Sequence, residues 1–255
     1  MTATIDGSAL TDQVLLITGG ARRVGAAIAR GLHAAGANVL LHYRSSAAAA
    51  KALAQELNEM RPGSVAIHGA DLLHPAAAEE LVAAARRQFG RLDILINNAS
   101  SFYPSPVGEI TAAQWDDLIG SNLKAPLFLS QAAAAALRLQ RGLIVNIVDI
   151  HGMRPLKGHV VYSVAKAGLA MLTRSLAREL GPEVRVNGIA PGPVLWPEGP
   201  MAAGLQQEIR IAHVAHARAN HTRRRGPAEG GKQREGEDHR SGWGNVQGQN
   251  GAGGN

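Results

Sequence analysis

Short β-branched or leucine-rich runs alternate with longer alanine-rich helical patterns from Gln13 to Ala190. This alternation is the signature of repeated βαβ units, in which strands joined by helices run parallel with right-handed crossovers. The pattern therefore predicts a doubly wound α/β fold with a parallel sheet and helices on both faces. We predict strands at 13–18, 38–43, 64–68, 92–96, 143–148 and 184–190, and helices at 25–35, 47–60, 75–89, 111–122 with a continuation towards 137, and 163–180.

Local signals mark several helix ends. Ser46 precedes the second helix and is expected to cap it, and Thr111 with Gln114 has the spacing of a capping box. Gly36 and Gly90 follow helices at positions where glycine usually ends them.

Composition excludes several classes of protein. The 255 residues are 45% apolar and 18% charged, which is typical of a folded globular chain. The longest uninterrupted apolar stretches are far shorter than the roughly 20 residues of a membrane span. The first thirteen residues lack a basic segment followed by an apolar one, so no secretory signal is expected. With no cysteine, disulfides and thiolate zinc sites are excluded, and we expect a cytoplasmic protein.

The chain divides into three parts by composition. Residues 1–12 are a leader, 13–211 a single domain, and 212–255 a Gly/Arg-rich tail with almost no bulky apolar residues. Such a tail cannot bury enough surface to offset the entropy of ordering it, so it is expected to be disordered. Of the net charge of +6, residues 216–255 contribute seven Lys/Arg against four Asp/Glu, which leaves the rest of the chain nearly balanced at 19 against 16. No zinc finger or aromatic-rich RNA-binding motif accompanies the basic tail, so neither nucleic acid nor a membrane is an expected partner.

A glycine-bearing turn joins the first strand to the first helix. It reads Thr18-Gly19-Gly20-Ala21-Arg22-Arg23-Val24-Gly25. Glycines allow a close approach of the backbone to a pyrophosphate, and a helix N-terminus offers N–H donors with a partial positive charge. The strand before the turn and the helix after it favour a dinucleotide site over a plain structural turn.

The end of the second strand predicts which dinucleotide binds. An NAD enzyme usually places an acidic residue there for the ribose hydroxyls, but this chain has Tyr43-Arg44-Ser45-Ser46. Arg44 with the two serine hydroxyls favours a 2′-phosphate, and so NADP(H). Asp71-Leu72 follows the third strand and is expected at the adenine, while Asn98-Ala99 follows the fourth strand and is expected at the ribose and nicotinamide.

A candidate reactive group follows the fifth strand. Tyr162 and Lys166 are four residues apart, so on a helix they share one face, and Asp149 lies thirteen residues before the tyrosine. An ammonium near a phenol stabilises the phenolate, so we expect a lowered pKa for Tyr162. A phenol of this kind is suited to general acid catalysis.

Taken together, these motifs resemble the short-chain dehydrogenase/reductase family. The resemblance rests on the glycine turn, on Asn97-Asn98-Ala99, Asn122, Tyr162 with Lys166, and Pro191-Gly192, and it covers about three quarters of the chain. Arg23 stands where the family usually has a middle glycine, and Asp149 where a serine is usual. These departures, with the segment N-N-A-S-S-F at 97–102, are similar to the pteridine reductase branch.

The resemblance implies a Rossmann-like fold and roles for particular residues. The implied reaction is reduction of a dihydropterin to a tetrahydropterin by NADPH, with Tyr162 and Asp149 supplying the proton. The implied catalytic residues are Asp149, Tyr162, Lys166 and Asn122, the last of these positioning Lys166 through a water, and the implied substrate contacts are Arg23, Ser100, Phe102, Asp149 and Tyr162. The implied cofactor contacts are Gly19, Arg22, Arg23, Val24, Gly25, Tyr43, Arg44, Ser45, Ser46, Asp71, Leu72, Asn98, Ala99, Ser100, Tyr162, Lys166, Pro191 and Gly192.

Two alternatives stay open at this point. One is a member of the same family that reduces a ketone such as a 3-oxoacyl thioester, and the other is a protein that binds the cofactor but turns over poorly. The second follows from the C-terminal region, where the family's final helix and strand are missing and a frame-shifted end is expected. Strand 184–190 would then be a sheet edge, and the oligomer usual for the family is doubtful. A metal site at His213, His216 and His221 is not expected, because no carboxylate lies among them.

Overall fold

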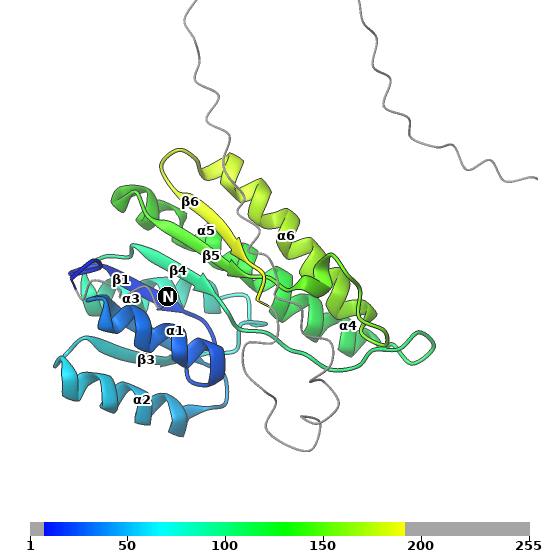
Figure 1. Cartoon of the computed structure of the whole chain (residues 1–255), viewed down its shortest axis with the longest axis horizontal. Coiled ribbons are helices and arrows are strands. Elements are labelled where there is room, and N and C mark those ends of the chain that lie inside the picture. Colours follow the sequence, from blue (N-terminus) through cyan, green and yellow to red (C-terminus); the bar gives the residue numbers. More distant parts are fainter. Residues whose placement is uncertain (1–7, 192–255) are drawn as a thin grey trace, which may run out of the picture. The chain divides into compact units, whose positions relative to one another are not determined.

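A computed structural model describes residues 8–191 and contains one parallel sheet. Its six strands lie in the order β3-β2-β1-β4-β5-β6, and helices flank the sheet (Figure 1). The predicted doubly wound, Rossmann-like fold is confirmed. The strands are β1 Val14–Ile17, β2 Asn38–Tyr43, β3 Val65–Gly69, β4 Ile94–Asn97, β5 Leu143–Ile147 and β6 Arg185–Ile189. The helices are α1 Arg23–Ala34, α2 Ala47–Met60, α3 Ala77–Phe89, α4 Ala112–Ile119, a π-helical turn Gly120–Lys124, α5 Ala125–Gln140, a short 3₁₀ turn Ile150–Gly152, and α6 Val160–Leu180.

The central strands are apolar on both faces because each face is covered. Leu15 and Ile17 of β1 belong to a buried cluster with residues of α1 and α2. Val14 and Leu16 point the other way and belong to a second cluster with residues of α3 and α5. A strand covered on both sides gains from a continuous apolar run, which explains why β1 shows no alternation of apolar and polar residues.

Most of the helix-end signals in the sequence are confirmed. Thr111 and Gln114 form the expected capping box, with the Gln114 N–H donating to Thr111 Oγ1 at 3.2 Å. Gly36 and Gly90 have positive φ angles of 102° and 81° just beyond α1 and α3. The expected cap at Ser46 is wrong: this residue occupies the N-cap position of α2, but its side chain makes no capping hydrogen bond.

Several element boundaries differ from the predictions by one to three residues, and the shift at the start of α6 affects the site. Helix α6 begins at Val160 rather than at Ser163, so Tyr162 lies within its first turn. Strand β4 begins at Ile94 rather than at Leu92. Asp93, just before this strand, donates its backbone N–H to the Val14 carbonyl oxygen at 3.0 Å, and its Oδ2 accepts the Val14 N–H at 2.9 Å.

Strand β6 lies at an edge of the sheet within the described range, paired only with β5. The expectations about the C-terminal tail, the missing final strand and the histidines at 213, 216 and 221 concern residues outside that range. Between residues 8 and 191, no helix combines the length and apolarity that a membrane crossing requires.

Candidate active site

The loops after β1 and β4 are joined by hydrogen bonds where the strand order reverses. Thr18 Oγ1 accepts the backbone N–H groups of Asn98 and Ala99, both at 3.0 Å. The Asn98 side-chain amide donates in return to the carbonyl oxygens of Thr18 at 2.9 Å and Gly19 at 3.0 Å. Ligands of open α/β sheets bind at the carboxyl ends of the strands at this reversal, so the bonds fix the floor of a ligand crevice.

The glycine turn is as tight as the sequence suggests. Gly19 has a φ of 61°, and a Cβ there would lie 3.0 Å from Ala99 Cα. A Cβ on Gly25 would overlap the Gly19 carbonyl oxygen. Helix α1 starts at Arg23 with no side-chain cap and no acidic residue in its first turn, which leaves its first N–H donors available to an anion.

His42 fixes the same turn, although sequence reasoning did not single it out. Its Nδ1 accepts the Gly19 N–H at 3.1 Å, and its Nε2 lies 3.0 Å from the Ala70 carbonyl oxygen. Burial lowers the pKa of His42, which favours a neutral ring that accepts at Nδ1 and donates at Nε2. A buried histidine inside an apolar strand was the signal that could have revealed this contact.

A cavity of about 260 Å³ opens above the crevice. Eleven of the predicted cofactor residues line it, namely Gly19, Arg22, Tyr43, Arg44, Ser45, Ser46, Asp71, Leu72, Asn98, Ala99 and Ser100. Five further lining residues were not predicted, namely Ala21, His42, Leu73, Ser101 and Ser121. The cavity therefore gathers residues from the ends of four successive strands and from the π-helical turn.

The other predicted cofactor residues lie elsewhere. Arg23, Val24 and Gly25 form the first turn of α1 and do not line the cavity. Arg23 is exposed and has a φ of 49°, a left-handed conformation that glycine adopts more easily. Pro191 follows β6, and Gly192 lies outside the described residues.

Tyr162 and Asp149 form a direct hydrogen bond. The phenol donates to Asp149 Oδ2 at 2.7 Å, and Asp149 Oδ1 accepts the His151 N–H at 2.9 Å. Tyr162 is buried, and burial raises its pKa above the ordinary value, reinforced by the charge and hydrogen bond of Asp149. The expected lowering of this pKa is therefore wrong for the described chain. Burial and the neighbouring carboxylate disfavour the phenolate.

Lys166 lies one helical turn beyond Tyr162, on the same face of α6 as predicted. Its Nζ is 5.6 Å from the centre of the phenol ring and donates to the Ile147 carbonyl oxygen at 2.9 Å. Burial lowers the pKa of Lys166 to about 8, although the charge of Asp149 acts in the opposite direction. At neutral pH this ammonium is an internal positive charge near both the phenol and the carboxylate.

Asn122 lies fully buried in the π-helical turn between α4 and α5. Its amide group donates to the carbonyl oxygens of Ser101 at 2.9 Å and Leu118 at 3.0 Å, and its oxygen accepts the Ser100 hydroxyl at 2.8 Å. Asn122 therefore orients the segment that carries Ser100 and Phe102. Single π turns inside helices are frequent at functional sites.

Phe102 is an exposed aromatic residue beside Tyr162. Its side chain is 56% exposed, and its ring stacks on His159 with centroids 4.8 Å apart. The rings of Phe102 and Tyr162 form a T-shaped pair with centroids 4.8 Å apart. Phe102 thus lies beside the phenol and still has surface free to contact a flat ligand.

This fold, with a tight glycine turn after β1, Tyr162 and Lys166 on one face of α6, and Asn122 bonded to Ser100 of the cavity, is typical of a class of oxidoreductases. The model of the short chain dehydrogenase family matches residues 13–208. The chain belongs to that family, as its motifs suggested.

Particular relatives refine the comparison. The chain is 40% identical over 239 residues to pteridine reductase 1 of Leishmania tarentolae, covering 78% of this chain and 82% of that protein. It is also 34% identical over 187 residues to uncharacterized oxidoreductases of Staphylococcus aureus strains USA300 and NCTC 8325, covering 72% of this chain and 79% of each relative.

Proposed function

We propose that the protein is an NADPH-dependent reductase of a pterin, of the type that converts a dihydropterin to a tetrahydropterin. The observation that carries the proposal is the hydrogen bond of 2.7 Å from the Tyr162 phenol to Asp149, with the Lys166 ammonium on the same helix face. An aspartate at this position, in place of a serine, is the feature by which the sequence resembles pteridine reductases. The similarity to pteridine reductase 1 of Leishmania tarentolae supports the same choice.

The residues of the crevice fit a phosphorylated dinucleotide. The turn leaves no room for a Cβ at Gly25, and the uncapped start of α1 offers N–H donors to a pyrophosphate. Arg44, Ser45 and Ser46 also line the cavity and suit a 2′-phosphate. When bound, the nicotinamide cofactor supplies the hydride.

The side chains of the protein then supply the proton. Because its pKa is raised, Tyr162 keeps its proton at neutral pH, as a proton donor must. The O–H group is held towards Asp149, and a substrate nitrogen within reach of either group would receive the proton from this pair. Lys166 provides the positive charge that offsets the carboxylate, and Asn122 holds the hydroxyl of Ser100, which lines the cavity.

The proposed substrate contacts are made by exposed side chains near Tyr162 and the glycine turn. The ring of Phe102 can stack on a flat pterin, which is worth about 0.5 to 1.5 kcal/mol beyond burial. The Ser100 hydroxyl and the planar guanidinium of Arg23 are the proposed polar contacts.

An assay of the purified protein tests the proposal. NADPH oxidation is measured with dihydrobiopterin and, in parallel, with a β-ketoacyl thioester. We expect turnover with the pterin. Turnover with the thioester alone would assign the chain to ketone reduction, and stabilisation by NADPH without turnover of either substrate would assign it to cofactor binding only.

The cofactor choice has its own test. Arg44→Ala should raise the Kd for NADPH at least about tenfold and leave the Kd for NADH within about twofold, since only NADPH carries the 2′-phosphate. Equal effects on both nucleotides would contradict the proposed role of Arg44.

A further inference from the structure

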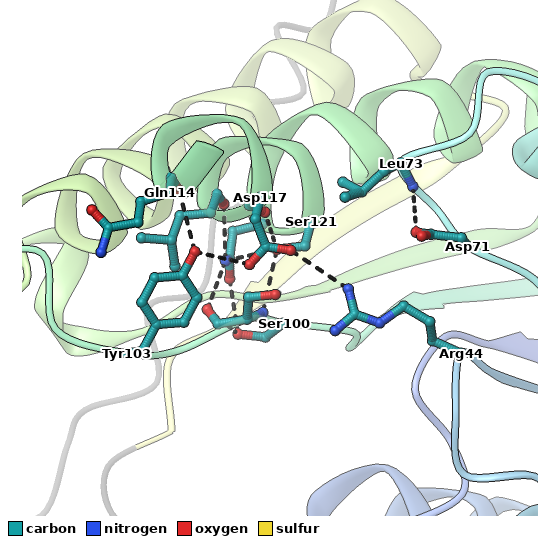
Figure 2. A network of polar contacts seen from close by, with 11 residues as sticks. Arg44, Asp71, Leu73, Ser100, Tyr103, Gln114, Asp117 and Ser121 are labelled. Atoms are coloured by element: carbon teal, nitrogen blue, oxygen red, sulfur yellow. Dashed lines mark hydrogen bonds and ion pairs between the residues drawn. The ribbon is translucent and has the colours of Figure 1, made fainter. Parts of the chain in front are cut away.

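An ion pair lies beside the proposed cofactor cavity. Arg44 follows β2, and its Nη1 lies 3.5 Å from Oδ1 of Asp117 in α4 (Figure 2). Arg44 lines the cavity on one side. Ser121, which lines it on the other, donates its hydroxyl to the Asp117 carbonyl oxygen at 2.7 Å. The pair therefore connects two walls of the cavity, and nothing in the sequence pattern indicated it.

The carboxylate is the fixed partner of this pair. The Tyr103 hydroxyl donates to Asp117 Oδ2 at 3.0 Å and lies 3.4 Å from the Gln114 carbonyl oxygen (Figure 2). The Asp117 side chain is 27% exposed, whereas that of Arg44 is 54% exposed. Arg44 can therefore move away more easily than Asp117, and the negative charge of Asp117 stays at the cavity edge in either case.

This charge matters for the ligand that Arg44 is proposed to bind. A 2′-phosphate at Arg44 would compete with Asp117 for the guanidinium and would be repelled by the carboxylate, since both are anionic. A nucleotide without the 2′-phosphate would meet neither effect. We propose that Asp117 is a specificity-determining residue that weakens binding at the 2′-phosphate and so limits the preference for NADPH over NADH. This inference rests on the cofactor choice proposed above.

Substitution of the carboxylate by an amide isolates the charge. Asp117→Asn keeps an oxygen that can accept the Tyr103 hydroxyl, and removes the negative charge. The matched control is Asp116→Asn, because Asp116 is an exposed aspartate on the same helix and forms no ion pair within the described residues. Asp117→Ser is a second uncharged variant, and thermal melting without nucleotide checks that each variant folds.

The readout is nucleotide binding by fluorescence titration, without substrate. We expect Asp117→Asn to lower the Kd for NADPH about threefold to tenfold, and to leave the Kd for NADH within about twofold. The gain should shrink as salt is added, because the cavity is open to solvent. Asp116→Asn should change neither Kd by more than about twofold.

Several outcomes would overturn the inference. A higher Kd for NADPH in Asp117→Asn would mean that the carboxylate helps to position Arg44. An equal change in the Kd values for NADPH and NADH, or a change no larger than that of Asp116→Asn, would also contradict the inference. A wrong cofactor proposal would give a different set of results. In that case the unaltered protein binds NADH as tightly as NADPH and Arg44→Ala has no selective effect. A protein that binds neither nucleotide would overturn both.

Discussion

Replacing Lys166 with methionine should change how the stability of the protein depends on pH. The Lys166 pKa falls from 10.5 to about 8 on folding, mainly because the ammonium is buried. The folded state therefore binds the proton less tightly than the unfolded state. Below pH 10.5 the unfolded state takes up the proton first, so the free energy of unfolding decreases as the pH falls. This decrease levels off below about pH 8. At neutral pH this cost is about 3 kcal/mol.

Methionine removes the titration and fills a similar volume. Stability of the unaltered protein should rise with pH between 7 and 9.5 by about 2 kcal/mol more than that of Lys166→Met. The comparison across pH cancels every effect of the substitution that does not depend on pH, such as changed packing. The assay is urea denaturation of both proteins at the two pH values.

The matched control is Lys51→Met, since Lys51 is exposed on α2. It should follow the unaltered protein at both pH values. If the difference between Lys166→Met and the unaltered protein were the same at pH 7 and pH 9.5, Lys166 would not be held at a lowered pKa, and the electrostatic account of the site would fail.

Two further substitutions test the turn and the capping box. Gly25→Ala should raise the Kd for NADPH more than about tenfold, because its Cβ would overlap the Gly19 carbonyl oxygen. The control Gly31→Ala on the same helix meets no atom and should stabilise the fold by about 0.5 to 1 kcal/mol. Nucleotide titration and thermal melting measure these effects, and unchanged binding in Gly25→Ala would contradict the proposed role of the turn. Thr111→Ala should destabilise by about 1 kcal/mol in urea, and no change would mean that the capping box contributes nothing.

The fold and much of the cavity follow from local sequence patterns. The βαβ alternation gives the sheet, since apolar strands and amphipathic helices have few other ways to bury their surface. The glycine turn, the segment after β2 and the segment after β4 are each read from a few adjacent residues. The parallel sheet then brings these segments to one edge, where Arg44 and Asn98 line the same cavity.

Contacts between distant segments were not predictable in this way. The bond from Gly19 to His42 and the pair of Arg44 with Asp117 depend on side-chain positions across loops that lie far apart in the sequence. The direction of the Tyr162 pKa was also missed. The prediction weighed only the charge of Lys166, whereas burial and Asp149 have the larger effect in the folded chain.

The rate of a single turnover in Tyr162→Phe tests the central claim most directly. Phenylalanine keeps the ring and removes only the hydroxyl that donates to Asp149 at 2.7 Å. With saturating NADPH and dihydrobiopterin, NADPH oxidation should slow by about 10² to 10⁴ while the Kd for NADPH stays within about twofold. An unchanged rate would contradict the claim that Tyr162 supplies the proton.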